Sequence, residues 1–153
     1  MKVRFGISLG QSLGGLRKPE EILDFVDRLE RLDVDSLWVS DRLVSPAFTL
    51  EPITFLSYVA GRLRRMKFGT STLVLSTRNP VILAKELATL DFISQGRLFP
   101  AVGLGSDDAQ DFAAVGISKK ERGRRSDEAI VLMRRLWSED NVSFSGKFFS
   151  IED

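Results

Sequence analysis

The feature of this sequence that most constrains its fold is a repeat of about 31 residues, in which a strand-like run precedes a helical pattern. Four apolar runs span residues 3–9, 36–40, 67–75 and 97–104. Each is followed by a segment whose apolar residues recur at helical spacing, over residues 19–32, 51–63, 79–94 and 121–137. Strands that alternate with helices in this way predict a parallel α/β sheet.

Proline positions support the predicted helix starts. Pro19, Pro52 and Pro80 each stand in the first turn of a predicted helix, where the missing proline N–H group costs nothing. Asn79 precedes Pro80 and is a suitable N-cap residue.

The near-constant period favours a (β/α) barrel over a doubly wound, flavodoxin-like sheet, although the second fold suits the length better. A complete (β/α)₈ barrel needs about 250 residues, and this chain has 153. The α/β pattern therefore predicts about four βα units, the N-terminal half of a TIM barrel, with the C-terminal half absent. Residues 142–153 read as a short β-hairpin around Ser145 and Gly146.

The composition excludes several classes of chemistry. The chain has no cysteine and no histidine, which excludes disulfides, thiolate metal sites and histidine-based acid–base catalysis. Its net charge is +1, which does not favour nucleic-acid or membrane partners. No signal peptide or membrane span is visible, so we expect a cytoplasmic protein with no metal site. An enzyme of this composition takes its difficult chemistry from a cofactor or from carboxylates.

Ligands of parallel α/β folds bind at the carboxyl ends of the strands, and four stretches qualify. The glycine-rich residues 8–15 lack the ending of a P-loop. Asp41 and Arg42 either face a ligand or form a structural ion pair or helix cap. Residues 70–72 carry three adjacent hydroxyls, which suit a flat heterocycle or simply a β-branched strand. Gly103 and Gly105 permit a close backbone approach to a ligand.

Three further features have plain structural alternatives. Asp107 and Asp108 are acid–base candidates, but acidic loop residues are usually only solvated. Trp38 and Trp137 are better explained by packing than by ligand stacking. The arginines at the start of the last predicted helix are disfavoured by the helix dipole, which makes an anionic partner more plausible there; they are Arg122, Arg124 and Arg125.

Taken in order, the motifs resemble the bacterial luciferase-like monooxygenases, a family of flavin- or deazaflavin-dependent (β/α)₈ enzymes. The resemblance covers almost the whole chain and rests on four stretches: VDSLWVSDR, FGTSTLVLSTRNPVILAKELATLD, SQGRLFPAVGLG and ERGRRSDEAIVLMRRLW. Residues 1–153 are thereby identified as the N-terminal part of a luciferase-like domain.

The resemblance implies a set of site residues. The cofactor-binding residues are expected to be Asp41, Ser71, Thr72, Gly103 and Gly105, with a cis peptide bond between Ser71 and Thr72. Deazaflavin members typically carry histidine where this chain has Arg42. An arginine cannot act as a general base at neutral pH, although it can stabilise an anionic substrate or a reduced flavin. Asp41 and Arg42 remain the catalytic candidates.

The function implied by the resemblance is that of an oxidoreductase or monooxygenase acting on a small organic substrate. It would use reduced FMN with O₂, or a reduced 8-hydroxy-5-deazaflavin coenzyme. The first alternative is a truncated, non-enzymatic half barrel that acts only as an association module. The second is a flavodoxin-like electron carrier. Because four strands leave two apolar sheet edges open, we also expect a homo-oligomer.

Overall fold

The centre of the computed structural model, which describes residues 3–10, 15, 18–108 and 110–152, is a four-stranded parallel sheet. Its strands lie in chain order: β1 (Gly6–Ser8), β2 (Ser36–Val39), β3 (Lys67–Val74) and β4 (Leu98–Gly103). Ser36 of β2 pairs with Gly6 on one side and with Lys67 on the other. The register shifts between Thr70 and Leu73, where β3 meets β4.

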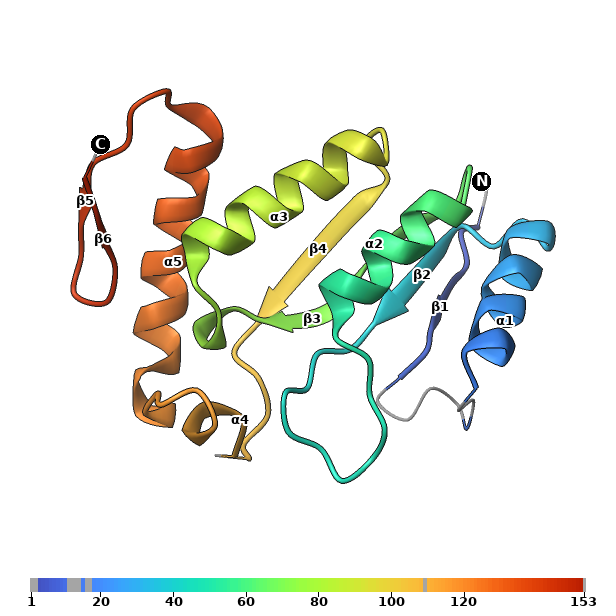
Figure 1. Ribbon diagram of the computed structural model, residues 1–153, viewed down its shortest axis with the longest axis horizontal. Helices are drawn as coiled ribbons and strands as arrows, with labels where there is room; N and C mark the ends of the chain where they lie inside the picture. Colours follow the sequence, from blue (N-terminus) through green and yellow to red (C-terminus); the bar gives the residue numbers. More distant parts are fainter. Residues whose placement is uncertain (1–2, 11–14, 16–17, 109, 153) are drawn as a thin grey trace.

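A long helix follows each strand, as the sequence repeat predicts (Figure 1). These helices are α1 (Pro19–Arg31), α2 (Pro52–Arg62), α3 (Pro80–Ile93) and α5 (Arg122–Ser138). Shorter elements lie between them: the one-turn helix α4 (Gln110–Ala113) and the 3-10 turns η2 (Leu75–Thr77) and η3 (Lys119–Glu121). The predicted hairpin is present as the antiparallel strands β5 (Phe144–Ser145) and β6 (Ser150–Ile151), beside α5 in Figure 1.

The helix starts follow the predicted capping chemistry. A proline occupies the first turn of α1, α2 and α3. The side chain of Asn79 accepts hydrogen bonds from the N–H groups of Val81 (2.9 Å) and Ile82 (3.3 Å). The Glu51 carboxylate caps α2 by accepting the Thr54 N–H at 2.6 Å. These caps satisfy N–H groups that have no partner within the helix.

The hydrophobic core lies on one side of the sheet, between the strands and the four long helices. Alternation along β2 places Leu37 and Val39 in this core, while Ser36 and Trp38 point to the other face. Phe99 and Ala101 of β4 are exposed as well. We call this second, open surface the inner face.

The arrangement decides between the two predicted folds. A doubly wound sheet carries helices on both faces, whereas the described helices cover one face only. The flavodoxin-like alternative is therefore wrong, and the fold is half of a (β/α)₈ barrel. The helix-covered side corresponds to the outside of the barrel and the inner face to its interior.

Two charged side chains hold the amino ends of the strands. The Glu30 carboxylate accepts the backbone N–H groups of Arg64 (3.0 Å), Arg65 (2.8 Å) and Met66 (3.0 Å), just before β3. Arg97, just before β4, donates to the carbonyl oxygens of three residues, namely Ser94, Met66 and Ala60. Both side chains bind the backbone of the loops that enter the strands.

Two details differ from the sequence prediction. The first strand is only three residues long, and α4 stands where a loop was expected. The predicted loop at residues 8–15 lies partly outside the described residues. Within the described ranges, no helix is long and apolar enough to cross a membrane, and no three acidic side chains are grouped so that they could hold a metal ion.

Candidate functional site

A hollow of about 380 Å³ opens on the inner face, towards the carboxyl ends of the strands. We call it the inner hollow. Its lining is neutral and is drawn from all four strands: Gly6, Ser8, Trp38, Thr70, Ser71, Thr72 and Ala101. Because no lysine or arginine lines it, the inner hollow suits an uncharged ring rather than a phosphate group.

Trp38 provides a flat wall of the inner hollow. Its indole Nε1 donates a 2.9 Å hydrogen bond to the Ser36 hydroxyl on the same face of β2. The neighbouring strands leave room for the ring with glycines. A Cβ atom at Gly6 would lie 2.7 Å from Trp38 Nε1, and one at Gly69 would lie 3.0 Å from Trp38 Cζ3. The indole is therefore held by packing, as predicted, and also borders the inner hollow.

The carboxyl half of β3 contributes the exposed hydroxyls. The peptide bond between Ser71 and Thr72 is cis, which confirms the expectation drawn from the resemblance. Both side chains are exposed on the inner face. Thr70 differs, because its buried hydroxyl donates a 2.8 Å hydrogen bond to the Ala101 carbonyl. Of the three predicted hydroxyls, two are accessible to a ligand and one binds β4.

The two predicted glycines lie at the end of β4 and are required by the packing of the protein itself. A Cβ atom at Gly103 would collide with the Thr72 hydroxyl. Gly105 has a φ of +80°, and a Cβ atom there would lie 2.9 Å from the Val74 side chain. Their small size brings β4 close to the residues that border the inner hollow.

Asp41 follows β2, at the predicted end of the sheet, but its side chain points into the protein. It is 6% exposed, and its carboxylate accepts the Val74 N–H at 2.9 Å and an Arg78 N–H at 3.0 Å. Burial raises the pKa of Asp41 above its ordinary value, although Arg78 and the Val74 N–H act in the opposite direction. Arg78 also forms a 3.0 Å ion pair with Glu51. The structure thus brings Asp41 to the ends of β2 and β3 in a buried ion pair.

Arg42 connects the loop after β2 with the loop after β4. Its guanidinium donates to the Ser106 hydroxyl (3.2 Å) and the Asp108 carboxylate (3.4 Å). Its Nε lies 3.2 Å from the buried Asp111 carboxylate, without the geometry of a hydrogen bond. Asp111 in turn accepts the Val44 N–H at 2.7 Å. Arg42 is therefore engaged by protein groups rather than turned towards the inner hollow.

The remaining charged candidates also have protein partners. Hydrogen bonds from Arg122 and Lys119 lower the pKa of Asp107, so this exposed side chain is a carboxylate and not a proton donor. Arg125 donates to the Ser76 carbonyl and lies over the rings of Phe148 and Phe149. Two of the three arginines at the start of α5 thus have partners within the chain, and an anionic partner at this helix start stays a prediction. Arg124 remains exposed.

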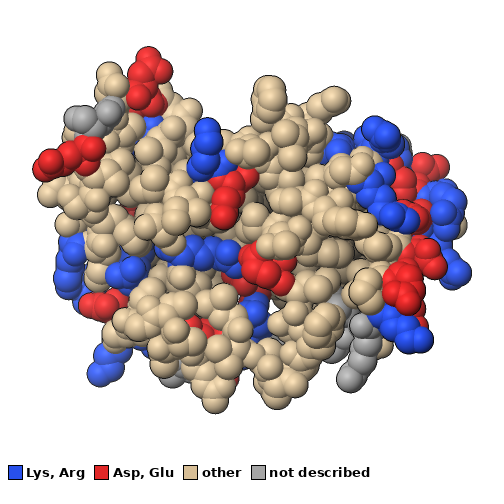
Figure 2. Space-filling view, viewed as in Figure 1, with Lys and Arg blue, Asp and Glu red and all other residues tan. Residues whose placement is uncertain are grey.

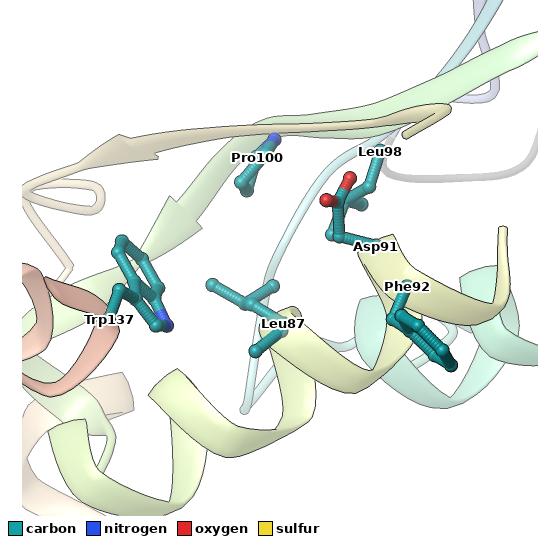
Figure 3. A pocket seen from close by; sticks show the side chains of 7 residues that line it. Leu87, Asp91, Phe92, Leu98, Pro100 and Trp137 are labelled. Carbon is teal, nitrogen blue, oxygen red and sulfur yellow. The ribbon is translucent and has the colours of Figure 1, made fainter. Parts of the chain in front are cut away.

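A second hollow, of about 420 Å³, lies on the other side of β4 (Figure 3). We call it the outer hollow. Leu87 of α3 and Trp137 of α5 point into it, towards Pro100 of β4. The Trp137 indole donates a 3.0 Å hydrogen bond to the Ala84 carbonyl, which fixes α5 against α3 as the packing prediction requires. The lining of the outer hollow is mostly apolar, and Asp91 of α3 is its one charged side chain among the described residues.

Comparison with known proteins explains this geometry. The family model described as luciferase-like monooxygenase matches residues 2–153. The chain belongs to the luciferase-like monooxygenase family. Within the family, the chain is 32% identical over 143 residues to an F420-dependent glucose-6-phosphate dehydrogenase of Kineococcus radiotolerans, a match that covers 88% of this chain and 42% of that protein.

Solved structures show the same relationship. An F420-dependent secondary alcohol dehydrogenase, in complex with an F420–acetone adduct, has a TM-score of 0.81 and 27% identity. The match covers 99% of this chain and 47% of that one. The oxygenating constituent of 3,6-diketocamphane monooxygenase from Pseudomonas putida, in complex with FMN, shares the fold with a TM-score of 0.85 and 20% identity; 99% of this chain and 43% of that one are covered. The chain thus spans less than half of the length of the luciferase-like proteins it matches.

The residues present fit the ring of a flavin or a deazaflavin. The inner hollow has a flat aromatic wall in Trp38, Gly6 beside that wall, and two exposed hydroxyls in Ser71 and Thr72. Sequence reasoning missed Arg78 as the partner of Asp41 and Asp111 as the partner of Arg42. The signal available for Arg78 was a charged residue directly before the Asn79–Pro80 cap, at the carboxyl end of β3.

Proposed function

We propose that this chain forms part of an oxidoreductase that binds the ring of reduced FMN or of the deazaflavin F420 and acts on a small organic substrate. The observation that carries the proposal is the neutral inner hollow at the carboxyl ends of the strands, where ligands of parallel α/β folds bind. Membership of the luciferase-like family supports an oxidoreductase rather than another enzyme class.

Each group of the site has a proposed task. Ser71 and Thr72 would hydrogen-bond the ring edge, while Trp38 would shield one ring face from water. The bound cofactor would supply the redox chemistry, by hydride transfer or by activation of O₂. Gly103 and Gly105 would keep the β4 loop close to the ring.

Asp41 and Arg42 act on the site through other residues. Asp41 holds the end of β3 through the Val74 N–H, and Arg42 holds the β4 loop through Ser106 and Asp108. We therefore assign both to positioning rather than to proton transfer. An arginine stays protonated at neutral pH, and the Asp41 carboxylate is bound on both oxygens.

Filling one hollow at a time tests this proposal. Ala101 borders the inner hollow and Ala88 borders the outer hollow, and both side chains are exposed. Titration with FMN and with F420, followed by cofactor fluorescence, should show that Ala101→Leu weakens binding about tenfold, a loss of roughly 1.4 kcal/mol. The matched variant Ala88→Leu should bind like the unaltered chain. Equal weakening by both variants, or no saturable binding of either cofactor at about 1 mM, would reject the assignment of the inner hollow.

A further inference from the structure

Two loops beyond the carboxyl ends of the strands are joined side by side. The first connects β2 with α2 (residues 40–51) and the second follows β4 (residues 104–108), so both belong to complete βα units at the lower side of Figure 1. Arg42 joins them, because it donates to the Val44 carbonyl and to the Ser106 hydroxyl, each at 3.2 Å. The Val44 N–H donates to Asp111 of α4 at 2.7 Å. We call the two loops together the carboxyl rim.

The carboxyl rim begins beside the inner hollow. The Ser40 hydroxyl donates a 3.4 Å hydrogen bond to the carbonyl of Ser71, which lines the hollow. The end of β4 approaches Thr72, a second lining residue, so closely that a Cβ atom at Gly103 would collide with the Thr72 hydroxyl. A substrate that reacts with a cofactor in the inner hollow therefore lies within reach of the carboxyl rim.

The charged side chains of the carboxyl rim are engaged within the chain. Each one in the two loops forms at least one ion pair: Asp41 and Glu51 with Arg78, Arg42 with Asp108 and Asp111, and Asp107 with Lys119 and Arg122. The side chains of Arg42 and Arg78 are only 14% and 15% exposed. An anionic substrate group would have to displace a carboxylate of the chain from these arginines, and the separation of such enclosed pairs is costly.

Apolar side chains of the carboxyl rim remain exposed. Leu43 (42%), Val44 (36%) and Phe48 (53%) project from the first loop, and Leu104 (47%) projects from the second. Figure 2 shows a mostly uncharged surface over the first loop. Contact of such side chains with an apolar ligand removes both from water and is favourable.

We propose that the carboxyl rim binds the apolar part of an uncharged organic substrate, and that Leu43 and Leu104 favour such a molecule over one that carries an anionic group. The proposal rests on the proposed function, because it places the substrate beside a cofactor bound in the inner hollow. The chain's contribution to substrate specificity is thus apolar contact, while its ion pairs hold the loops that present the two leucines.

A matched pair of small ligands tests this specificity. Cyclohexanone is uncharged, and cyclohexanecarboxylate carries a negative charge on the same six-membered ring. Methyl NMR spectra of the leucine- and valine-labelled chain, recorded without cofactor, should show saturable shifts at Leu43, Val44 and Leu104 with a millimolar dissociation constant for cyclohexanone. Cyclohexanecarboxylate should bind about fivefold more weakly or less. Equal or tighter binding of the carboxylate, or shifts confined to Leu87 in the outer hollow, would overturn the proposal.

A charged variant inverts the expected preference. Leu43→Lys places a cation without a carboxylate partner on the carboxyl rim, and should weaken cyclohexanone binding and strengthen cyclohexanecarboxylate binding, each about fivefold. Leu32→Lys is the matched control, because Leu32 is 75% exposed just after α1 and the same charge there should change neither constant more than about twofold. Circular dichroism checks that both variants are folded. Equal responses of the two variants would contradict a role of Leu43 in selection.

FMN titration separates this inference from the proposed function. Ala101→Leu fills the inner hollow and should weaken FMN binding, while cyclohexanone binding to the cofactor-free chain should stay within about twofold. A chain that binds FMN as expected, but binds both ring ligands equally well, would overturn the inference about the carboxyl rim alone. A selective carboxyl rim in a chain that binds neither FMN nor F420 would reject the proposed function, and with it the assignment of the bound ring as a substrate.

Discussion

At the amino ends of the strands, the Glu30 carboxylate accepts hydrogen bonds from three backbone N–H groups. At the carboxyl ends, the Asp41 carboxylate accepts a hydrogen bond from one backbone N–H group and forms an ion pair with Arg78. The first arrangement ties loop backbone to a side chain at the protein surface. The second places an ion pair between loops, with a buried carboxylate. The two ends of one sheet are therefore held by different physical means.

The difference concerns how completely polar groups are satisfied. Near the carboxyl ends, three buried atoms have no hydrogen-bond partner among the residues that the structure describes: Arg42 Nε, Arg78 Nε and Ser76 Oγ. Buried polar groups in proteins are normally paired, so each unpaired group calls for a structural or functional reason. In (β/α) barrels the carboxyl ends carry the active site and the amino ends carry stability. The polar contacts of this half barrel follow the same division.

The largest expected effect comes from breaking the buried ion pair. Asp41→Ala leaves Arg78 with Glu51 alone and removes the acceptor of the Val74 N–H. Loss of one partner of a buried pair costs about 3 kcal/mol or more. Urea unfolding followed by circular dichroism measures this change in the free energy of unfolding.

Glu30→Ala provides the comparison at the amino ends. It should cost roughly 2 kcal/mol, because water can reach the released N–H groups. Asp107→Ala, which removes an exposed carboxylate near the carboxyl ends, should change the free energy of unfolding by about 0.5 kcal/mol or less. If Glu30→Ala proves more costly than Asp41→Ala, the contrast between the two ends is reversed.

A smaller effect is expected from closing the space between β3 and β4. Gly103→Ala forces the Thr72 side chain to move and should lower the free energy of unfolding by about 1 kcal/mol through overpacking. Gly61→Ala in α2 meets nothing within 4 Å and should stabilise the chain by about 0.5 kcal/mol or more. Because Thr72 borders the inner hollow, only Gly103→Ala should also weaken cofactor binding. If the Gly103→Ala variant binds the cofactor as well as the unaltered chain does, Gly103 does not influence the inner hollow.

The smallest effect is an opposite response of the two carboxylates to acid. Burial raises the pKa of Asp41 above 3.8, so its contribution to stability grows as the pH falls through the raised pKa and is complete below 3.8. Burial acts to raise the pKa of Glu30 as well, but the N–H groups of Arg65, Arg64 and Met66 outweigh it and lower the pKa below 4.5. The contribution of Glu30 is therefore present above pH 4.5 and lost as the pH falls through the lowered pKa.

Urea titrations between about pH 7 and pH 3 can resolve this difference. On acidification, the unaltered chain should gain stability relative to Asp41→Asn and lose stability relative to Glu30→Gln. If the stability difference from the unaltered chain changes in the same direction on acidification for both variants, the pKa values of Asp41 and Glu30 are not shifted in opposite directions.

Local sequence signals predicted most of the fold. Proline and asparagine at the helix starts, and alternation along β2, placed the elements within a few residues. The helix α4 was missed because it is a single turn, which is too short for a periodic pattern. The cis bond at Ser71–Thr72 came from the family resemblance, since no local pattern in a single sequence signals it.

The site was predicted less completely, because side-chain direction depends on contacts between distant segments. The sequence placed Asp41 at the right end of the sheet, but its partner Arg78 lies 37 residues further along the chain. Thr70, Ser71 and Thr72 look equivalent in sequence, and only the pairing of β3 with β4 shows that Thr70 binds the Ala101 carbonyl. Whether the predicted residues contact a cofactor remains a prediction.

The positions of the two tryptophans give each side of the sheet its own optical reporter. Trp38 borders the inner hollow and Trp137 borders the outer hollow, and the chain has no other tryptophan and a single tyrosine. Emission excited in the indole band is therefore the sum of two contributions, which Trp38→Phe and Trp137→Phe separate. A yellow chromophore bound above the inner face would accept excitation energy from Trp38, whereas a strand added to β4 would change the polarity around Trp137. Ligand occupancy and strand pairing thus carry distinct spectral signatures within one unlabelled polypeptide.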